Sequence, residues 1–137
     1  MKMRYLISLL ASLVMMPVYG EIFVVVSHES AIHQMNESEV ADVYLGRKRS
    51  FGRVDITQVF DRSDEVRARF FGKVANMRTS QINAYWAKLK FSGRMRAPDV
   101  IETDIELVEH LLANPNAIGY MQTSPPEELK VVATIYE

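Results

Sequence analysis

The sequence has 137 residues, a formal net charge of −1 and no cysteine. These values exclude two full-sized domains, a disulfide framework and the strongly basic surface of a typical nucleic-acid-binding protein. The chain is therefore expected to hold one compact domain that is stabilised by its apolar core alone.

The N-terminal residues have the three parts of a secretory signal peptide. Two basic residues precede an apolar run (5–16), and Gly20 stands directly before Glu21. Such a run is short for a membrane span, which needs roughly 20 apolar residues. We expect a cleaved signal peptide (1–20) and a single exported domain (21–137), with an uncleaved anchor as the weaker alternative. An exported chain without cysteine is typical of the bacterial periplasm.

The first half of the expected domain alternates strand and helix. The continuous apolar run at 22–26 is typical of a strand buried on both faces. Asn36 and Glu39 form a capping-box pair that predicts a short helix ending at Gly46. Alternating apolar and polar residues then predict a second strand of roughly six residues within 54–60.

The second half contains three further amphipathic segments. Apolar residues at helical spacing predict helices over about 64–74, 79–89 and 103–112, and Thr79 or Ser80 is expected to cap the second of these helices. The segments 117–121 and 129–135 are predicted as closing strands. Strands alternating with helices predict an α/β fold, a single three-layer domain whose mixed or parallel sheet is flanked by helices.

The turns that follow the first two strands are the candidate binding positions, since sheets of this kind bind ligands beyond the carboxyl ends of their strands. Arg62, Ser63 and Asp64 follow the second strand and begin a helix. A guanidinium, a hydroxyl and a helix N-terminus suit a tetrahedral anion. Ser27 and Ser30, after the first strand, are weaker candidates for further hydroxyl groups. The alternative is that Ser63 or Asp64 only caps the helix.

Other groups of polar residues give weaker signals. Two basic loops (47–53 and 92–98) are most simply solvated, and a docking surface for an acidic partner or anionic lipid head groups is the alternative. His28, Glu29 and His33 lack a recognised metal-ligand spacing. The sequence contains no motif of a catalytic nucleophile, a phosphate-binding loop or a zinc protease. We therefore expect no metal, no cofactor and no enzymatic activity.

Four segments stand in a characteristic order along the chain. They are Val-Tyr-Leu-Gly-Arg-Lys (43–48), Val-Phe-Asp-Arg-Ser-Asp (59–64), Tyr-Trp (85–86) with Phe-Ser-Gly-Arg (91–94), and Ala-Ile-Gly-Tyr (117–120). Together they resemble the small exported proteins grouped with the substrate-binding proteins of phosphate ABC transporters, in the type 2 periplasmic binding protein superfamily. The resemblance implies a periplasmic-binding-protein-like domain equivalent to one lobe of such a receptor.

The resemblance also implies a ligand and its site. In the full-length receptors, an Arg-x-Asp-Gly-Ser-Gly-Thr segment binds the anion, and Arg62 and Asp64 match its first and third residues. Residues 65–68 replace the Gly-Ser-Gly-Thr part, where Arg67 is expected to supply a second cation in place of the missing hydroxyl groups; the alternative is that the helix phase directs its side chain to solvent.

Two functions remain after this comparison with the receptor pattern. The first is a module that binds phosphate or a similar oxyanion, for transport or sensing. The second is a ligand-free interaction or regulatory module that docks on an inner-membrane transporter or sensor protein. Since one lobe leaves a ligand open to water, a homodimer is a further hypothesis.

Overall fold

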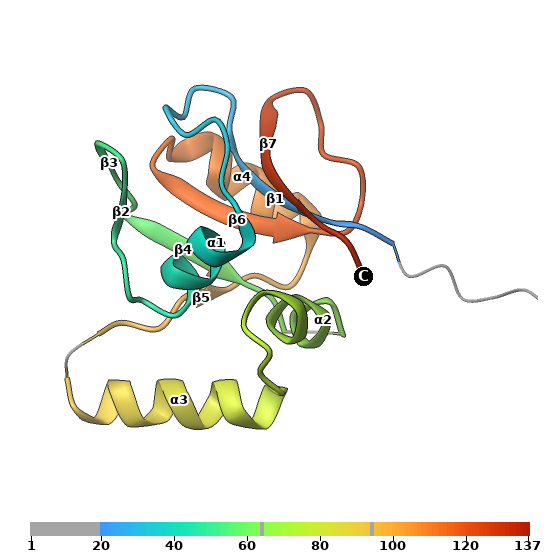
Figure 1. Cartoon of the computed structure of the whole chain (residues 1–137). Helices are drawn as coiled ribbons and strands as arrows, with labels where there is room; N and C mark the ends of the chain where they lie inside the picture. Colours follow the sequence, from blue (N-terminus) through green and yellow to red (C-terminus); the bar gives the residue numbers. More distant parts are fainter. Residues whose placement is uncertain (1–19, 64, 94) are drawn as a thin grey trace, which may run out of the picture.

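The computed structural model describes residues 20–63, 65–93 and 95–137 (Figure 1). Residues 1–19 of the predicted signal peptide, the predicted ligand residue Asp64 and the loop residue Arg94 lie outside the described residues. In the described ranges, no helix has both the length and the apolar character needed to cross a membrane.

A five-stranded mixed sheet forms the centre of the fold. Its strands, in spatial order, are β5 (Asp99–Val100), β4 (Gln58–Asp61), β6 (Ala117–Met121), β1 (Ile22–Ser27) and β7 (Leu129–Ile135). Strand β4 is parallel to both of its neighbours, whereas β1 is antiparallel to β6 and β7. The predicted mixed sheet is confirmed, and β1 is buried as its unbroken apolar sequence indicates.

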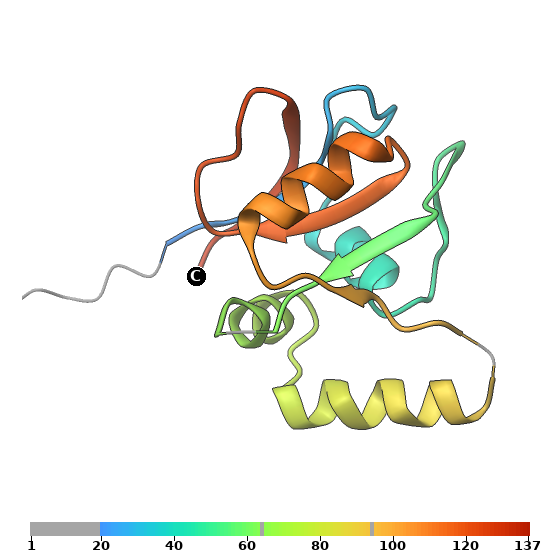
Figure 2. The ribbon, with the colours of Figure 1, turned by 180° about the vertical axis from the view of Figure 1, so that it is seen from behind.

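Helices cover both faces of this sheet (Figures 1 and 2). The helices of the described ranges are α1 (Glu37–Tyr44), α2 (Glu65–Val74), α3 (Thr79–Phe91) and α4 (Asp104–Ala113). Apolar residues of α1 and α2 pack on one face together with Val24 and Ile118, and Leu107 and Leu111 of α4 pack on the other. Helix α3 lies outside α2, farthest from the sheet. This arrangement confirms the predicted three-layer α/β architecture.

Two local predictions need correction. The expected second strand is divided, because β3 (Val54–Asp55) pairs with β2 (Ser50–Phe51) in a separate hairpin and only β4 enters the main sheet. Gly52, at φ +61°, supplies the left-handed turn between β2 and β3. Helix α3 already begins at Thr79, so the residue before its first turn is Arg78, whose N–H donates to Gln81 Oε1 at 2.9 Å.

The capping-box prediction for α1 is confirmed. Asn36 Oδ1 accepts from the Glu39 N–H at 2.8 Å, and Glu39 Oε1 accepts from the Asn36 N–H at 3.0 Å. The helix ends at Tyr44, just before Gly46.

The directions of the strands decide which turns can share a site. Because β4 is parallel to β5 and β6, the segments that follow these three strands meet at one edge of the sheet. Helices α2 and α4 both begin at this edge (Figure 2). Strand β1 runs the opposite way, so Ser27 lies level with the beginning of β6 rather than with its end.

Candidate functional site

Arg62 directs its side chain into the protein, at the edge where β4, β5 and β6 end. Only 5% of that side chain is exposed. Its Nε donates to the Ile101 carbonyl at 3.0 Å, and its two terminal nitrogens donate to the carbonyls of Tyr120 and Glu102 at 3.3 and 3.4 Å. Its Nη1 also forms an ion pair with Asp104 Oδ1 at 2.8 Å. One guanidinium therefore joins β4 to the segments that follow β5 and to the strand β6.

Asp104 extends this network to the segment after β6. Its second carboxylate oxygen, Oδ2, accepts from the Thr123 hydroxyl at 2.7 Å, while Oδ1 holds Arg62. Thr103, the residue before α4, accepts from the Glu106 N–H at 3.2 Å and so fixes the start of the helix that carries Asp104. The loops at this edge are thus bonded to one another by side chains of the protein itself.

Asp61 lies beneath the same turn as a buried carboxylate with three donors. Its Oδ1 accepts from the Tyr120 hydroxyl at 2.5 Å and from the Arg62 N–H at 2.8 Å. Its Oδ2 accepts from Arg67 Nε at 2.9 Å, and the Arg67 guanidinium lies 5.4 Å from the centre of the Phe71 ring. Arg67, predicted as a second cation for the anion, is therefore the ion-pair partner of Asp61.

Two tyrosines surround this carboxylate. Burial, followed by the negative charge of Asp61, raises the pKa of Tyr120 far above its ordinary value of 10. The same two causes raise the pKa of Tyr44, while the charge of Arg62 acts in the opposite direction. The Phe70 ring stacks on Tyr120 with a centroid distance of 3.9 Å, which adds to the burial of the phenol. Tyr120 therefore stays neutral at ordinary pH and remains a hydrogen-bond donor to Asp61.

The structure does not bring all predicted site residues together. Ser63 is exposed beside Arg62. Ser27 and Ser30 are buried at the opposite edge of the sheet, because β1 is antiparallel to β6. Their hydroxyl oxygens accept from the N–H groups of Glu29 at 3.3 Å and Ile32 at 3.1 Å, so they stabilise the turn after β1. The prediction that they join the Arg62 turn does not fit this topology.

The charge balance at the Arg62 edge limits what the turn can bind. Arg69, the third arginine of the described edge, pairs with Glu137 at 2.9 Å and also donates to Gln122. Two acidic residues close to these turns, Glu65 and Glu102, are exposed. Arg62, Arg67 and Arg69 therefore each have an acidic partner within the protein.

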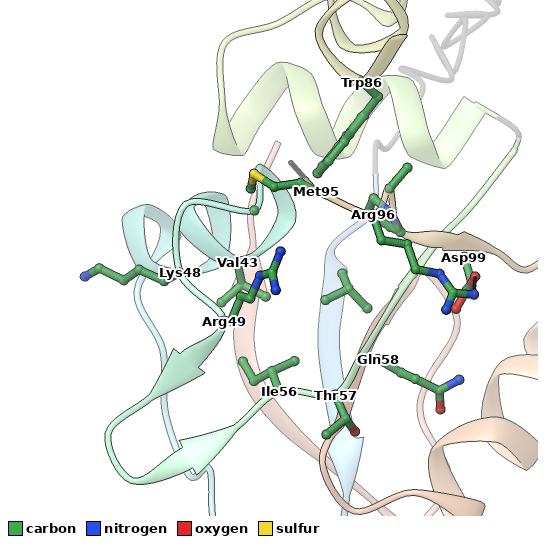
Figure 3. Close-up of a pocket in the computed structure, with 14 residues that line it drawn as sticks. Val43, Lys48, Arg49, Ile56, Thr57, Gln58, Trp86, Met95, Arg96 and Asp99 are labelled. Carbon is green, nitrogen blue, oxygen red and sulfur yellow. Dashed lines mark hydrogen bonds and ion pairs between the residues drawn. The ribbon is translucent and has the colours of Figure 1, made fainter. Parts of the chain in front are cut away.

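A separate hollow lies near the beginning of β4, beside α1 and α3 (Figure 3). It has a volume of about 420 Å³. Its lining includes Arg49 from the first basic loop and Arg96 from the second. The basic character of both loops is visible in the sequence. That they line the same hollow could not be predicted, because the two loops are far apart along the chain. In the described ranges, no three acidic or histidine side chains gather as a set of metal ligands.

The fold is that of one lobe of known phosphate-binding proteins. One similar structure is a Clostridium perfringens protein with bound phosphate, assigned to the phosphate ABC transporter substrate-binding proteins (TM-score 0.64, 15% identity, 82% of this chain and 45% of that chain). An ABC-type phosphate transport receptor from Vibrio cholerae gives a TM-score of 0.53 at 12% identity, over 82% of this chain and 46% of the receptor. PstS from Borrelia burgdorferi gives 0.52 at 16% identity, over 74% of this chain and 41% of PstS.

These comparisons confirm the predicted resemblance as a likeness of fold. The chain spans less than half the length of each of these three structures. No protein-family model and no curated protein matches the chain.

Proposed function

We propose that this chain is an exported, substrate-binding-protein-like module that binds phosphate or a similar small oxyanion, for transport or sensing in the periplasm. The observation that carries the proposal is the position of the Arg62 turn. On the fold of a phosphate-receptor lobe, it stands at the carboxyl end of β4 and directly before α2. This is where sheets with parallel strands bind their ligands. The same likeness supports a binding role rather than catalysis.

In this proposal Arg62 acts from below the site. Its guanidinium holds the loops in place and adds positive charge, while the Ser63 hydroxyl and the N-terminus of α2 contact the anion. A single lobe leaves that anion in water, where charge interactions are weak. We therefore expect a dissociation constant on the order of 1 mM, which corresponds to about −4 kcal/mol.

The inward direction of Arg62 supports the second candidate function. Its guanidinium donates to three carbonyls and one carboxylate of the protein, so it is already provided with partners. A lobe in which this turn arginine is bonded to the protein itself suits an interaction or regulatory module. Its partner would be an inner-membrane transporter or a sensor protein, and a homodimer would cover the same open edge.

A titration followed by NMR separates these two functions. The full chain is expressed from its first residue, exported and purified, and its mass is expected to match residues 21–137. Phosphate, with sulfate as the control anion, should shift the amide signals of residues 61–67. Ser63→Glu should abolish these shifts by repulsion, whereas Ser38→Glu, at an exposed serine in the first turn of α1, should preserve them. No shift at 50 mM phosphate, about fifty times the expected dissociation constant, would reject oxyanion binding and leave the docking module.

A further inference from the structure

The hollow near the beginning of β4 has an apolar wall and a polar floor (Figure 3). Its wall is formed by Val43, Ile56, Trp86 and Met95, and Thr57 and Gln58 add polar groups. A volume of about 420 Å³ falls within the range of small-molecule sites, roughly 300–1,000 Å³. The hollow is therefore large enough for a ligand with an apolar body.

Gly46 allows the wall of the hollow to close. It has φ +69°, and a Cβ atom there would lie 2.3 Å from Met95 Cε and 3.1 Å from Trp86 Cη2. Only glycine permits Met95 and Trp86 to approach the end of α1 so closely. The phenol of Tyr85 donates to the Leu45 carbonyl at 2.6 Å and fixes α3 against the same turn.

The indole nitrogen of Trp86 lies within the protein rather than on the open surface of the hollow. It is buried, and it has no hydrogen-bond partner in the part of the chain that the structure describes. Only 8% of Trp86 is exposed, and the residue lines the hollow. The Trp86 side chain therefore contributes apolar ring surface to the wall of the hollow.

The charge of the rim indicates the sign of that ligand. A second, adjoining hollow shares Arg49, Met95, Arg96 and Ala97 with the first and adds Lys90. In Figure 3 the Arg49 side chain lies among the lining residues, between Ile56 and Met95, whereas Lys48 extends away from them. Asp99 is the acidic residue among the described lining, and it pairs with Arg96 at 3.4 Å while 87% of the Arg96 side chain stays exposed. Such an exposed pair is weak, so the Arg96 guanidinium still offers positive charge at the rim.

We propose that this hollow is a second ligand site, for a small anionic molecule with an apolar, aromatic or branched body. The anionic group lies at the Arg49–Arg96 rim and the body packs against Trp86 and Met95. An inorganic anion would leave the apolar wall without contacts. The site is at the amino end of β4, roughly 10 Å along the strand from Asp61 at about 3.3 Å per residue, so it does not depend on the Arg62 turn.

Trp86 reports binding directly, because it is the single tryptophan of the chain. The purified full chain is titrated with 3-phenylpropionate, with 3-phenylpropionamide to remove the charge and propionate to remove the ring. We expect a saturable change of Trp86 emission with 3-phenylpropionate, and at least tenfold weaker binding of the other two. The absence of a saturable change, or equal binding of the neutral amide, would overturn the proposal.

Matched charge reversals locate the anionic group. Arg96→Glu should weaken binding of 3-phenylpropionate at least tenfold. Arg53→Glu makes the same charge change at an exposed residue outside the hollow lining and should have no effect. Equal weakening by both variants would reject the site and indicate a general charge effect. Ser63→Glu should leave this titration unchanged, which separates its outcome from that of the phosphate experiment.

Discussion

Replacing Arg62 with alanine tests whether the buried guanidinium holds the functional edge together. The substitution removes the donors of three carbonyls and the cation that faces Asp104. Removing one partner of a buried ion pair costs about 3–5 kcal/mol. Asp104 is 32% exposed and keeps its bond to Thr123, so its carboxylate regains some hydration. We therefore expect a loss of about 3 kcal/mol, at the low end of that range.

Urea unfolding, followed by Trp86 emission and by circular dichroism, measures this loss. Arg96→Ala is the matched control, since its pair with Asp99 is exposed and is expected to contribute less than about 0.5 kcal/mol. Arg62→Lys should lie between the two, because an ammonium cannot reproduce the planar fork. A loss below about 1 kcal/mol for Arg62→Ala would refute the structural role. Arg62 would then be available to an anion, as the sequence first indicated.

Three further predictions concern the same network and the neighbouring hollow. Tyr120→Phe should lower the free energy of unfolding by about 1.5–3 kcal/mol in urea, because Asp61 loses a donor; an unchanged midpoint would contradict this bond. Gly46→Ala should lower the free energy of unfolding in urea more than Gly52→Ala. Both glycines have positive φ, but of the two only Gly46 has the Met95 side chain in close contact. Equal losses would exclude an effect of that contact. Raising the pH above about 10 should destabilise the fold by about 1.4 kcal/mol per unit for each buried phenol, because the unfolded chain loses protons that the folded chain keeps. Urea midpoints at pH 9–11, with a flat profile as the contrary result, check this direction.

The sequence predicted those helices and strands that depend on interactions between residues close together in the chain. The run at 22–26 has apolar residues on both faces, so it required a strand covered on two sides, as β1 is. The pair Asn36 and Glu39 bonds within one turn, and its geometry follows from a spacing of three residues. The α/β architecture follows from the order of such elements. The alternating residues at 54–60 did not predict the division into β3 and β4. An alternating pattern indicates extended backbone, but it does not show with which strand each residue pairs.

The environment of Arg62 could not be read in the same way. The sequence places an arginine between a strand and a helix, but its acceptors belong to residues 39 to 58 positions away. Whether the side chain enters the protein depends on those carbonyls, which become neighbours only when β5 and β6 align beside β4. The separation of Ser27 from Arg62 likewise depends on the direction of β1, which an apolar run does not encode. The hollow beside Trp86 needs residues 46–49 and 95–99 to meet, again through tertiary packing.

The inward direction of Arg62 has a physical reason in a chain of this size. A small domain buries a lower fraction of its surface than a large one, so each buried contact is a larger part of its stability. In a two-lobed receptor, closure removes the ligand from water and strengthens its bonds to charged groups. A single lobe lacks that gain, whereas bonds from Arg62 to carbonyls within the lobe are already removed from water. The bonds of Arg62 therefore serve the stability of the loops at the carboxyl end of β4.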